Sequence, residues 1–166
     1  ATLSGWPSCE EYHLVDLWAP QENYRDIANV GQKAQDLILR EAMDRLEEWW
    51  DAKIRMCRNY TSVCARGFEE GYFDYIYVDA RHDYKGVWED VNAYWPKLRR
   101  GGIMAGHDYV TQNDGPAQTG QNWTANYDGT VDATGTVVKG AVDAFAEKVC
   151  RQVTVSYREQ GWNSWA

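Results

Sequence analysis

The sequence is poor in the features that mark several large protein classes. Among its 166 residues, Lys and Arg number 17 and Asp and Glu number 25, so the net charge is −8. A chain with so few basic residues is a poor match for the phosphate backbone of a nucleic acid or for an anionic membrane surface. No apolar run approaches the ~18 residues that a membrane span needs. The composition therefore argues against nucleic-acid and membrane partners.

Cysteine is also scarce, and a secretion signal is not visible. The four cysteines are Cys9, Cys57, Cys64 and Cys150, and none of them forms a CxxC pair. This spacing argues against a zinc knuckle and against a disulfide scaffold, so we expect reduced thiols. The N-terminus lacks a basic start followed by an apolar stretch, which favours the cytoplasm.

The hydrophobic residues that are present, 44% of the chain, alternate between two periodicities. Runs typical of strands cover 12–18, 54–57, 73–79, 103–106 and 153–157, and a sixth begins at 162–165. Helical patterns cover 27–53, 88–98 and 137–149. This alternation predicts one α/β domain over 1–166, a three-layer sandwich with a mostly parallel sheet and helices on both faces. The polar stretch 111–136 is long for a connector, which makes it a candidate substrate lid.

Polar residues stand at the ends of three predicted strands. Asp16 ends the first, Asp79 follows 73–78, and His107-Asp108 follow 103–106. Ligands of parallel sheets bind at the carboxyl ends of the strands. A carboxylate at the end of a buried strand needs a ligand, a metal or a helix terminus to compensate its desolvation. These positions are therefore the candidate site.

Each strand end has a functional and a structural interpretation. Asp79 and His82 are three residues apart, so they suit a general base with its carboxylate or a pair of metal ligands. Asp79 with Asp108 offers hard oxygen ligands for Mg²⁺ or Mn²⁺, and an adjacent His107 favours Mn²⁺ or Fe²⁺ over Mg²⁺. The structural alternatives are a solvated His82 followed by an Asp83 that caps the next helix, a His107 bonded to a backbone carbonyl, and an Asp16 that caps the turn before Pro20.

Several of these motifs together resemble the class I S-adenosylmethionine-dependent methyltransferases. The resemblance is strongest to a group of small-molecule O-methyltransferases in which one strand ends in Asp-x-x-His-x-Tyr and the next in Gly-His-Asp. The matching segments here are Phe73–Tyr84, Trp95–Leu98, Gly101-Gly102, Gly106–Asp108, Val15–Trp18 and Val138–Val142. The likeness runs from about Tyr12 to the C-terminus.

This resemblance implies a role for particular residues. Asp16 would bind the ribose of S-adenosylmethionine, with Trp18 close to the adenine ring. Tyr60, Thr61 and Ser62 would contact the adenine, and Asp79 would lie at the cofactor. Asp79, His107 and Asp108 would hold a divalent cation, and His82 would be the base. The implied activity is O-methylation of a small hydroxylated molecule such as a sugar.

The sequence also departs from the family pattern. Only one glycine, Gly5, precedes Asp16, so the first strand and its glycine-rich loop are missing, and the chain ends within the expected last strand. We therefore expect a domain clipped at both ends, which borrows a strand from a partner or forms a homo-oligomer. The alternative function is a non-catalytic methyltransferase-like structural or binding module. An NAD-dependent oxidoreductase would have a similar nucleotide-binding fold, but no residue pattern in this sequence indicates a hydride-transfer site.

Overall fold

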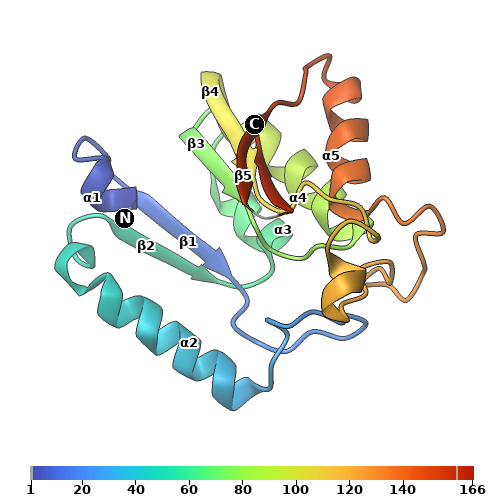
Figure 1. Ribbon diagram of the computed structural model, residues 1–166. Helices are drawn as coiled ribbons and strands as arrows, with labels where there is room; N and C mark the ends of the chain where they lie inside the picture. Colours follow the sequence, from blue (N-terminus) through green and yellow to red (C-terminus); the bar gives the residue numbers. More distant parts are fainter. Residues whose placement is uncertain (1, 160) are drawn as a thin grey trace. The chain divides into compact units, whose positions relative to one another are not determined.

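The computed structural model describes residues 2–159 and 161–166, without the side chain of residue 159 (Figure 1). The chain divides into two compact units. The first unit consists of residues 2–20 and 30–64, and the second consists of residues 21–29 and 65–166. Each unit has its own hydrophobic core.

The first unit is built on a pair of parallel strands. Strand β1 (Tyr12–Asp16) pairs with β2 (Ile54–Arg58), in a register that places Asp16 opposite Arg58. Its helical elements are α1 (Thr2–Gly5), α2 (Gln32–Arg45), η1 (Glu47–Trp49) and α3 (Thr61–Cys64). The core consists of Leu3, Cys9 and Ile54, with partly buried aromatic and aliphatic residues around them.

Helix α2 is shorter than the helix predicted over 27–53. A carboxylate oxygen of Asp26 accepts the backbone N–H of Ala28 at 2.7 Å, so the chain turns there instead of coiling. Gly31, whose backbone is extended, then precedes the first turn. The apolar periodicity correctly predicted a helix over Gln32–Arg45, but the predicted start at 27 and end at 53 were wrong, since the chain continues from Leu46 into η1 and turns.

The expectation of four reduced cysteines was wrong for two of them. Cys57 near the end of β2 forms a disulfide with Cys64 at the end of α3, and their Cα atoms are 6.1 Å apart. Cys9 is a buried free thiol and Cys150 an exposed one. The sequence separation of seven residues matched no known motif. Only the turn between β2 and α3 brings the two side chains together.

The second unit contains a four-stranded sheet. Its strands are β3 (Phe73–Val78), β4 (Leu98–Gly106), β5 (Val155–Glu159) and β6 (Trp162–Trp165), in the order β3-β4-β6-β5. β3 and β4 are parallel, whereas β6 is antiparallel to both β4 and β5. The helical elements are η2 (Ala65–Gly67), α4 (Tyr84–Tyr94), η3 (Trp95–Lys97), η4 (Pro116–Thr119) and α5 (Val137–Lys148). The predicted α/β class is confirmed.

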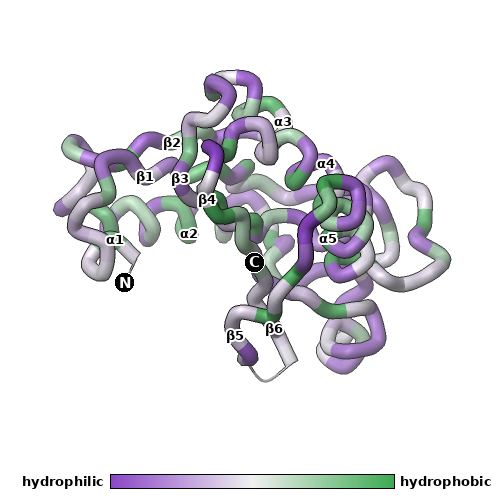
Figure 2. The backbone as a smooth tube through the Cα atoms, turned by 90° about the horizontal axis from the view of Figure 1, so that it is seen from above, coloured by the Kyte–Doolittle hydropathy of each residue, from purple (hydrophilic) through white to green (hydrophobic). Residues whose placement is uncertain are grey.

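Helices α4 and α5 form the core with the sheet. Val91 on α4, Val142 on α5 and Met104 on β4 belong to one buried cluster. Figure 2 shows hydrophobic stretches along β4 and α5, whereas the connecting loops are largely polar. Within residues 2–159 and 161–166, no helix is both long enough and apolar enough to cross a membrane.

Glycine at position 106 is required by packing within the sheet. A Cβ atom there would lie 2.5 Å from the carbonyl oxygen of Val78 and 2.6 Å from the Trp165 ring. Neither neighbour can give way easily, because one is backbone of the adjacent strand and the other is a buried indole. Gly106 therefore allows β4 to lie close to both β3 and β6.

The stretch 111–136 folds back on the second unit through a series of local turns. Asp114, Asp128 and Asp132 each accept hydrogen bonds from a nearby threonine N–H and hydroxyl. Trp123 in the middle of the segment is only 1% exposed and belongs to the core. Its turns and its buried anchor hold this candidate lid against the site residues described next.

Candidate functional site

Three polar side chains meet at the carboxyl ends of β3 and β4. The Nε2 atom of His82 lies 3.4 Å from an Asp79 oxygen and 3.1 Å from an Asp108 oxygen. One ligand atom from each residue lies within 4.8 Å of the other two. β3 and β4 are parallel neighbours, so the residues that follow them emerge at the same edge. The structure thus brings together three of the residues singled out in the sequence.

The opposite edge of the His82 ring faces the loop 21–29. Its Nδ1 atom lies 2.9 Å from the Tyr24 hydroxyl and 3.1 Å from an Asp26 oxygen. The Trp123 ring lies against the imidazole, with 4.3 Å between ring centroids. The side chain of His82 is 14% exposed and that of Asp26 only 2%. His82 is therefore enclosed by partners on both nitrogen edges and one side.

These partners shift the ionisation of the cluster. Burial by itself opposes protonation of His82, but hydrogen bonds to Asp26 and Asp79 and the charge of Asp108 outweigh it, so the pKa of His82 rises to about 9. Burial likewise acts to raise the pKa of Asp26, yet the His82 and Ala28 hydrogen bonds outweigh it and lower that pKa. Burial raises the pKa of Asp108, although the charges of the nearby histidines act to lower it. In the chain without a cation, His82 is an imidazolium held between carboxylates.

The loop that follows β3 is held by a buried ion pair. The Arg81 guanidinium binds the carboxylate of Asp83, which is fully buried. Arg81 also donates to the carbonyl oxygens of Glu22 (3.0 Å) and Asn23 (2.8 Å), and it stacks over the Tyr24 ring at 4.6 Å. Arg81 thereby fixes loop 21–29 beside the strand end that carries His82.

Asp83 has a second function at the start of α4. One of its oxygens accepts the N–H of Gly86 at 3.1 Å, and its own backbone is extended, as expected for an N-cap. The structural alternative for this segment, in which Asp83 caps the next helix, is therefore confirmed. The other part of that alternative, a solvated His82, is wrong, because the His82 side chain is enclosed.

His107 lies beside the cluster without belonging to it. Its Nδ1 atom is 3.1 Å from one Asp108 oxygen, while the other Asp108 oxygen faces His82. The backbone of Asp108 is left-handed (φ 55°), and the Trp165 indole donates to the His107 carbonyl at 3.2 Å. Among the described residues, the histidine that joins the two aspartates is His82.

The residues expected to bind a nucleoside lie in the first unit. Asp16 ends β1, and its carbonyl accepts the N–H of Asn59 at 3.1 Å, which joins the end of β1 to the segment after β2. Tyr60 is 58% exposed, and Thr61 and Ser62 begin the adjoining α3. An exposed carboxylate next to an exposed aromatic ring fits a ribose and its base.

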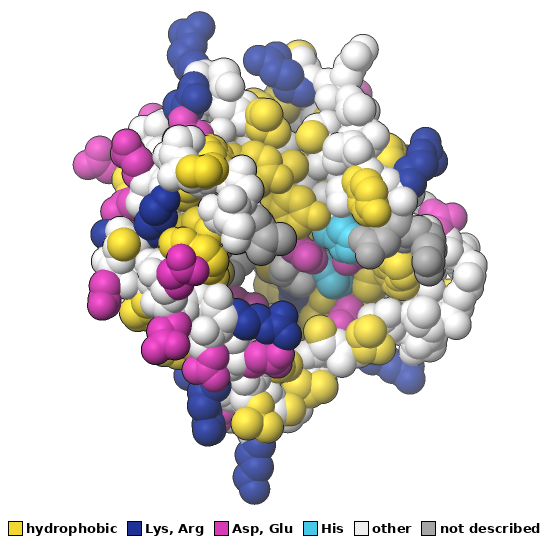
Figure 3. Space-filling view, turned by 60° about the vertical axis from the view of Figure 1, so that its left-hand side comes forward, with side chains coloured by type: hydrophobic (Ala, Val, Ile, Leu, Met, Phe, Trp, Pro, Cys, Tyr) yellow, Lys and Arg dark blue, Asp and Glu magenta, His cyan; other side chains and the backbone are white. Residues whose placement is uncertain are grey.

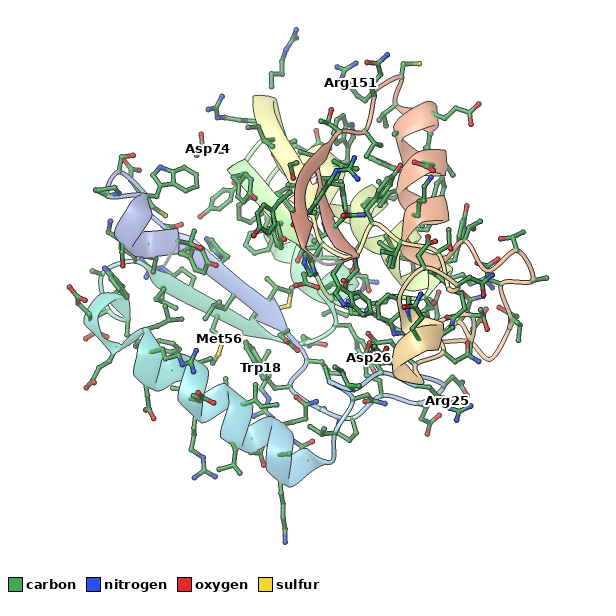
Figure 4. The ribbon with its side chains drawn as sticks, in the orientation of Figure 1. Trp18, Arg25, Asp26, Met56, Asp74 and Arg151 are labelled. Atoms are coloured by element: carbon green, nitrogen blue, oxygen red, sulfur yellow. A yellow bond between two sulfur atoms is a disulfide. The ribbon has the colours of Figure 1, made fainter. Side chains whose placement is uncertain are left out.

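Two local contacts limit this nucleoside assignment. A carboxylate oxygen of Asp16 accepts the Trp18 N–H at 2.9 Å, which is the turn-capping contact of the structural alternative. Trp18 itself is only 5% exposed. Figure 4 shows Trp18 and Met56 pointing to the side of the β1–β2 pair where α2 lies. Tyr60 therefore offers more ring surface to a base than Trp18 does.

The cluster of Asp79, His82 and Asp108 also fits a small divalent cation. Neighbouring ligands of an ion with bonds of about 2.1 Å lie roughly 3 Å apart. The distances from His82 to the two carboxylates, 3.1 and 3.4 Å, are of this size. Figure 3 shows histidine side chains next to acidic ones on the face turned to the viewer. The two carboxylates are hard oxygen ligands that suit Mg²⁺ or Mn²⁺. His82 Nε2 can act beside them either as a third ligand or as a base, because its single lone pair cannot do both.

Comparison with known proteins identifies the family. A family model described as a methyltransferase domain matches residues 3–109, most of the chain. The chain belongs to this methyltransferase family. S-Adenosylmethionine is the cofactor that such a domain implies. No curated protein matches the chain.

A solved structure shares the fold of this chain. A crystal structure of a protein from Corynebacterium glutamicum has a TM-score of 0.50 and 15% sequence identity to this chain. The alignment covers 94% of this chain but only 60% of that protein. At this identity the likeness concerns the fold alone. This methyltransferase chain thus spans less than two thirds of the length of its structural neighbour.

The sequence did not indicate the partners on the Nδ1 edge of His82. Tyr24 and Asp26 come from a loop without a recognisable motif, 58 and 56 residues before the histidine. Trp123 lies within the polar stretch 111–136. The one local hint was an aromatic residue in a segment otherwise rich in Gly, Asn, Asp and Thr, since such a residue needs a place to be buried.

Proposed function

We propose that this chain is an S-adenosylmethionine-dependent methyltransferase that methylates a hydroxyl group of a small molecule such as a sugar. The observation that carries the proposal is the cluster of Asp79, His82 and Asp108 at adjacent strand ends. It combines an acceptor for a proton with carboxylates for a cation, which is what activation of a hydroxyl needs. This donor set supports a hydroxyl group as the acceptor, whereas a sugar as the acceptor molecule is what the family resemblance implies.

The cofactor would be held by the first unit. The Asp16 carboxylate would accept hydrogen bonds from the ribose hydroxyls, and the exposed Tyr60 ring would contact the adenine with Thr61 and Ser62 beside it. When bound, the cofactor supplies a sulfonium methyl group. The residues of this chain need only orient the nucleoside, which is consistent with the polar, solvent-facing character of Asp16 and Tyr60.

The acceptor would be activated by the second unit. Asp79 and Asp108 would hold Mg²⁺ or Mn²⁺, with His107 beside Asp108. A divalent cation there would acidify the hydroxyl and, by neutralising the two carboxylates, return the pKa of His82 toward its ordinary value. His82 Nε2 then takes the hydroxyl proton. The cofactor, when bound, would supply the methyl group to that oxygen, and S-adenosylhomocysteine would be its product.

A calorimetric titration of the chain with S-adenosylhomocysteine, with and without Mn²⁺, tests the proposal. We expect micromolar binding, weakened by Asp16→Asn. Asp44→Asn is the matched control, because Asp44 is an exposed aspartate of the same unit on α2. Failure of the folded chain to bind S-adenosylhomocysteine would contradict the proposal and would favour a non-catalytic module.

A second titration with Mn²⁺ alone tests the cation site. We expect Asp79→Asn to weaken Mn²⁺ binding strongly, because it removes one of two carboxylates from the cluster. Asp74→Asn is the control on β3, the strand that Asp79 follows, since Asp74 is exposed and pairs with Arg99. Equal Mn²⁺ affinity of the two variants would contradict the cation assignment. Methyl transfer to a panel of hydroxylated acceptors then identifies the substrate.

A further inference from the structure

Asp26 is a buried acidic residue that the proposed reaction does not use directly. Its side chain is 2% exposed and comes from a loop, not from a strand end. One of its oxygens accepts the Ala28 N–H at 2.7 Å, and the other lies 3.1 Å from His82 Nδ1. Figure 4 shows Asp26 directed inward, whereas the exposed Arg25 beside it is directed away from the unit. A buried carboxylate costs free energy unless its hydrogen bonds compensate it.

The hydrogen-bond directions around His82 Nδ1 can be assigned by elimination. An ionised carboxylate only accepts, so the Asp26 oxygen must receive the Nδ1–H. The Tyr24 hydroxyl, 2.9 Å from the same nitrogen, is then an acceptor toward the ring and directs its own proton elsewhere. With Nδ1–H donated to loop 21–29, Nε2 is the atom left facing Asp79 and Asp108.

We propose that Asp26 is a positioning residue for His82: it holds the Nδ1–H of the ring so that Nε2 faces the Asp79–Asp108 pair. The inference rests on the proposed function, since it concerns the residue proposed as the base there. A carboxylate that fixes the far nitrogen of a histidine selects its tautomer and its orientation. Trp123 restrains the ring from the side, with 4.3 Å between centroids, but it cannot select which nitrogen points outward. Asp26 is the carboxylate on the Nδ1 edge, so it holds that edge toward loop 21–29 and leaves Nε2 toward Asp79 and Asp108.

Nuclear magnetic resonance of the whole chain labelled with ¹⁵N in its three histidine rings tests this role. The spectra are recorded at pH 6 without a cation, and the His82→Gln variant assigns the His82 signals. We expect the Nδ1–H of His82 to give a far-downfield, slowly exchanging proton resonance. In Asp26→Asn this resonance should be lost, or exchange with water at least about tenfold faster, because a hydrogen bond to a charged group is replaced by a neutral one.

Tyr24→Phe is the matched control. It removes the other polar neighbour of Nδ1 but leaves the carboxylate, so the downfield resonance should remain. The far-ultraviolet circular dichroism of each variant reports whether it folds. An Nδ1–H resonance unchanged in folded Asp26→Asn, or lost in Tyr24→Phe and kept in Asp26→Asn, would overturn the proposal. If Asp26→Asn does not fold, Asp26→Glu replaces it, and recovery of the wild-type resonance by Glu would support a charged acceptor while its loss would contradict one.

This test is separate from the test of the proposed function. The ring signals are read without cofactor or substrate, so they report only the Asp26–His82 contact. Absence of S-adenosylhomocysteine binding would refute the transferase proposal whatever the spectra show. Once a methyl acceptor is known, Asp26→Asn should lower kcat far more than it changes KM.

Discussion

The buried ion pair between Arg81 and Asp83 allows a quantitative prediction about stability. Asp83 is fully buried, and the Arg81 side chain is 9% exposed. Replacing Asp83 with Asn leaves a buried guanidinium without its counter-charge, and loss of one partner of a buried pair costs about 3–5 kcal/mol. Because Asn is as good an N-cap as Asp, the contact to the Gly86 N–H should survive. Arg81 also keeps its bonds to two loop carbonyls, so we expect a cost near the lower end, about 3 kcal/mol.

Hydrogen exchange of α4 peptides in increasing urea measures this cost, because α4 is capped by Asp83 and belongs wholly to the second unit. In a melting experiment the same change corresponds to roughly 6–12 °C. Asp74→Asn is the control: the Arg99–Asp74 pair is exposed, so its loss should cost less than about 1 kcal/mol.

The double variant Arg81→Met/Asp83→Asn tests the reason for the loss. It removes both charges and keeps the cap, so it should be more stable than Asp83→Asn alone. The reasoning would be refuted if Asp83→Asn cost no more than Asp74→Asn, or if the double variant were less stable than the single one. The first result would mean that the buried charge pair contributes little to stability. The second would mean that the Arg81 bonds to the loop carbonyls outweigh the cost of its unpaired charge.

Three further predictions concern other parts of the molecule. Trp123→Ala should destabilise the second unit by about 3–5 kcal/mol in urea unfolding, because it removes a side chain that is 1% exposed. Reduction of the Cys57–Cys64 disulfide should cost about 2 kcal/mol, measured as a lower melting temperature in dithiothreitol that Cys57→Ser reproduces without dithiothreitol. The pKa of His82 rises from 6.5 to about 9 on folding, so its protonation stabilises the fold fully below pH 6.5, and that stabilisation disappears as pH rises through about 9. In buffer with a chelator we expect the free energy of unfolding to fall by on the order of 3 kcal/mol over this range. The urea midpoint of His82→Gln should not show this pH dependence.

Local patterns in the sequence were sufficient for much of the second unit. The run Phe73–Val78 was recognisable from its β-forming residues, and the glycines near β4 and the apolar spacing of α5 were equally local signals. Asp79 and Asp108 could be paired from sequence because the ends of parallel neighbouring strands meet. By contrast, the start of α2 was misplaced, since a side-chain turn at Asp26 competes with helix formation and periodicity does not register it.

For the candidate site, the sequence predicted the residues on the Nε2 edge of His82 but not those on its Nδ1 edge. Asp79, His82 and Asp108 follow strands, so their positions depend on strand register, which the alternation of side chains encodes. Asp26 and Trp123 reach His82 from loops, and no spacing rule relates them to it. The pairing of Cys57 with Cys64 also depended on the turn between β2 and α3.

The sequence by itself determined the α/β class and the strand ends that carry acidic side chains, because each depends on residues close together in the chain. The tertiary structure alone decided that His82 is held between carboxylates on both nitrogen edges. Such contacts join residues separated by 56 positions on one side and 26 on the other, and they form only when the core and the Arg81 ion pair place loop 21–29 beside β3. Burial then strengthens the electrostatic interactions among the charged groups of the cluster, and no local sequence pattern indicates that burial.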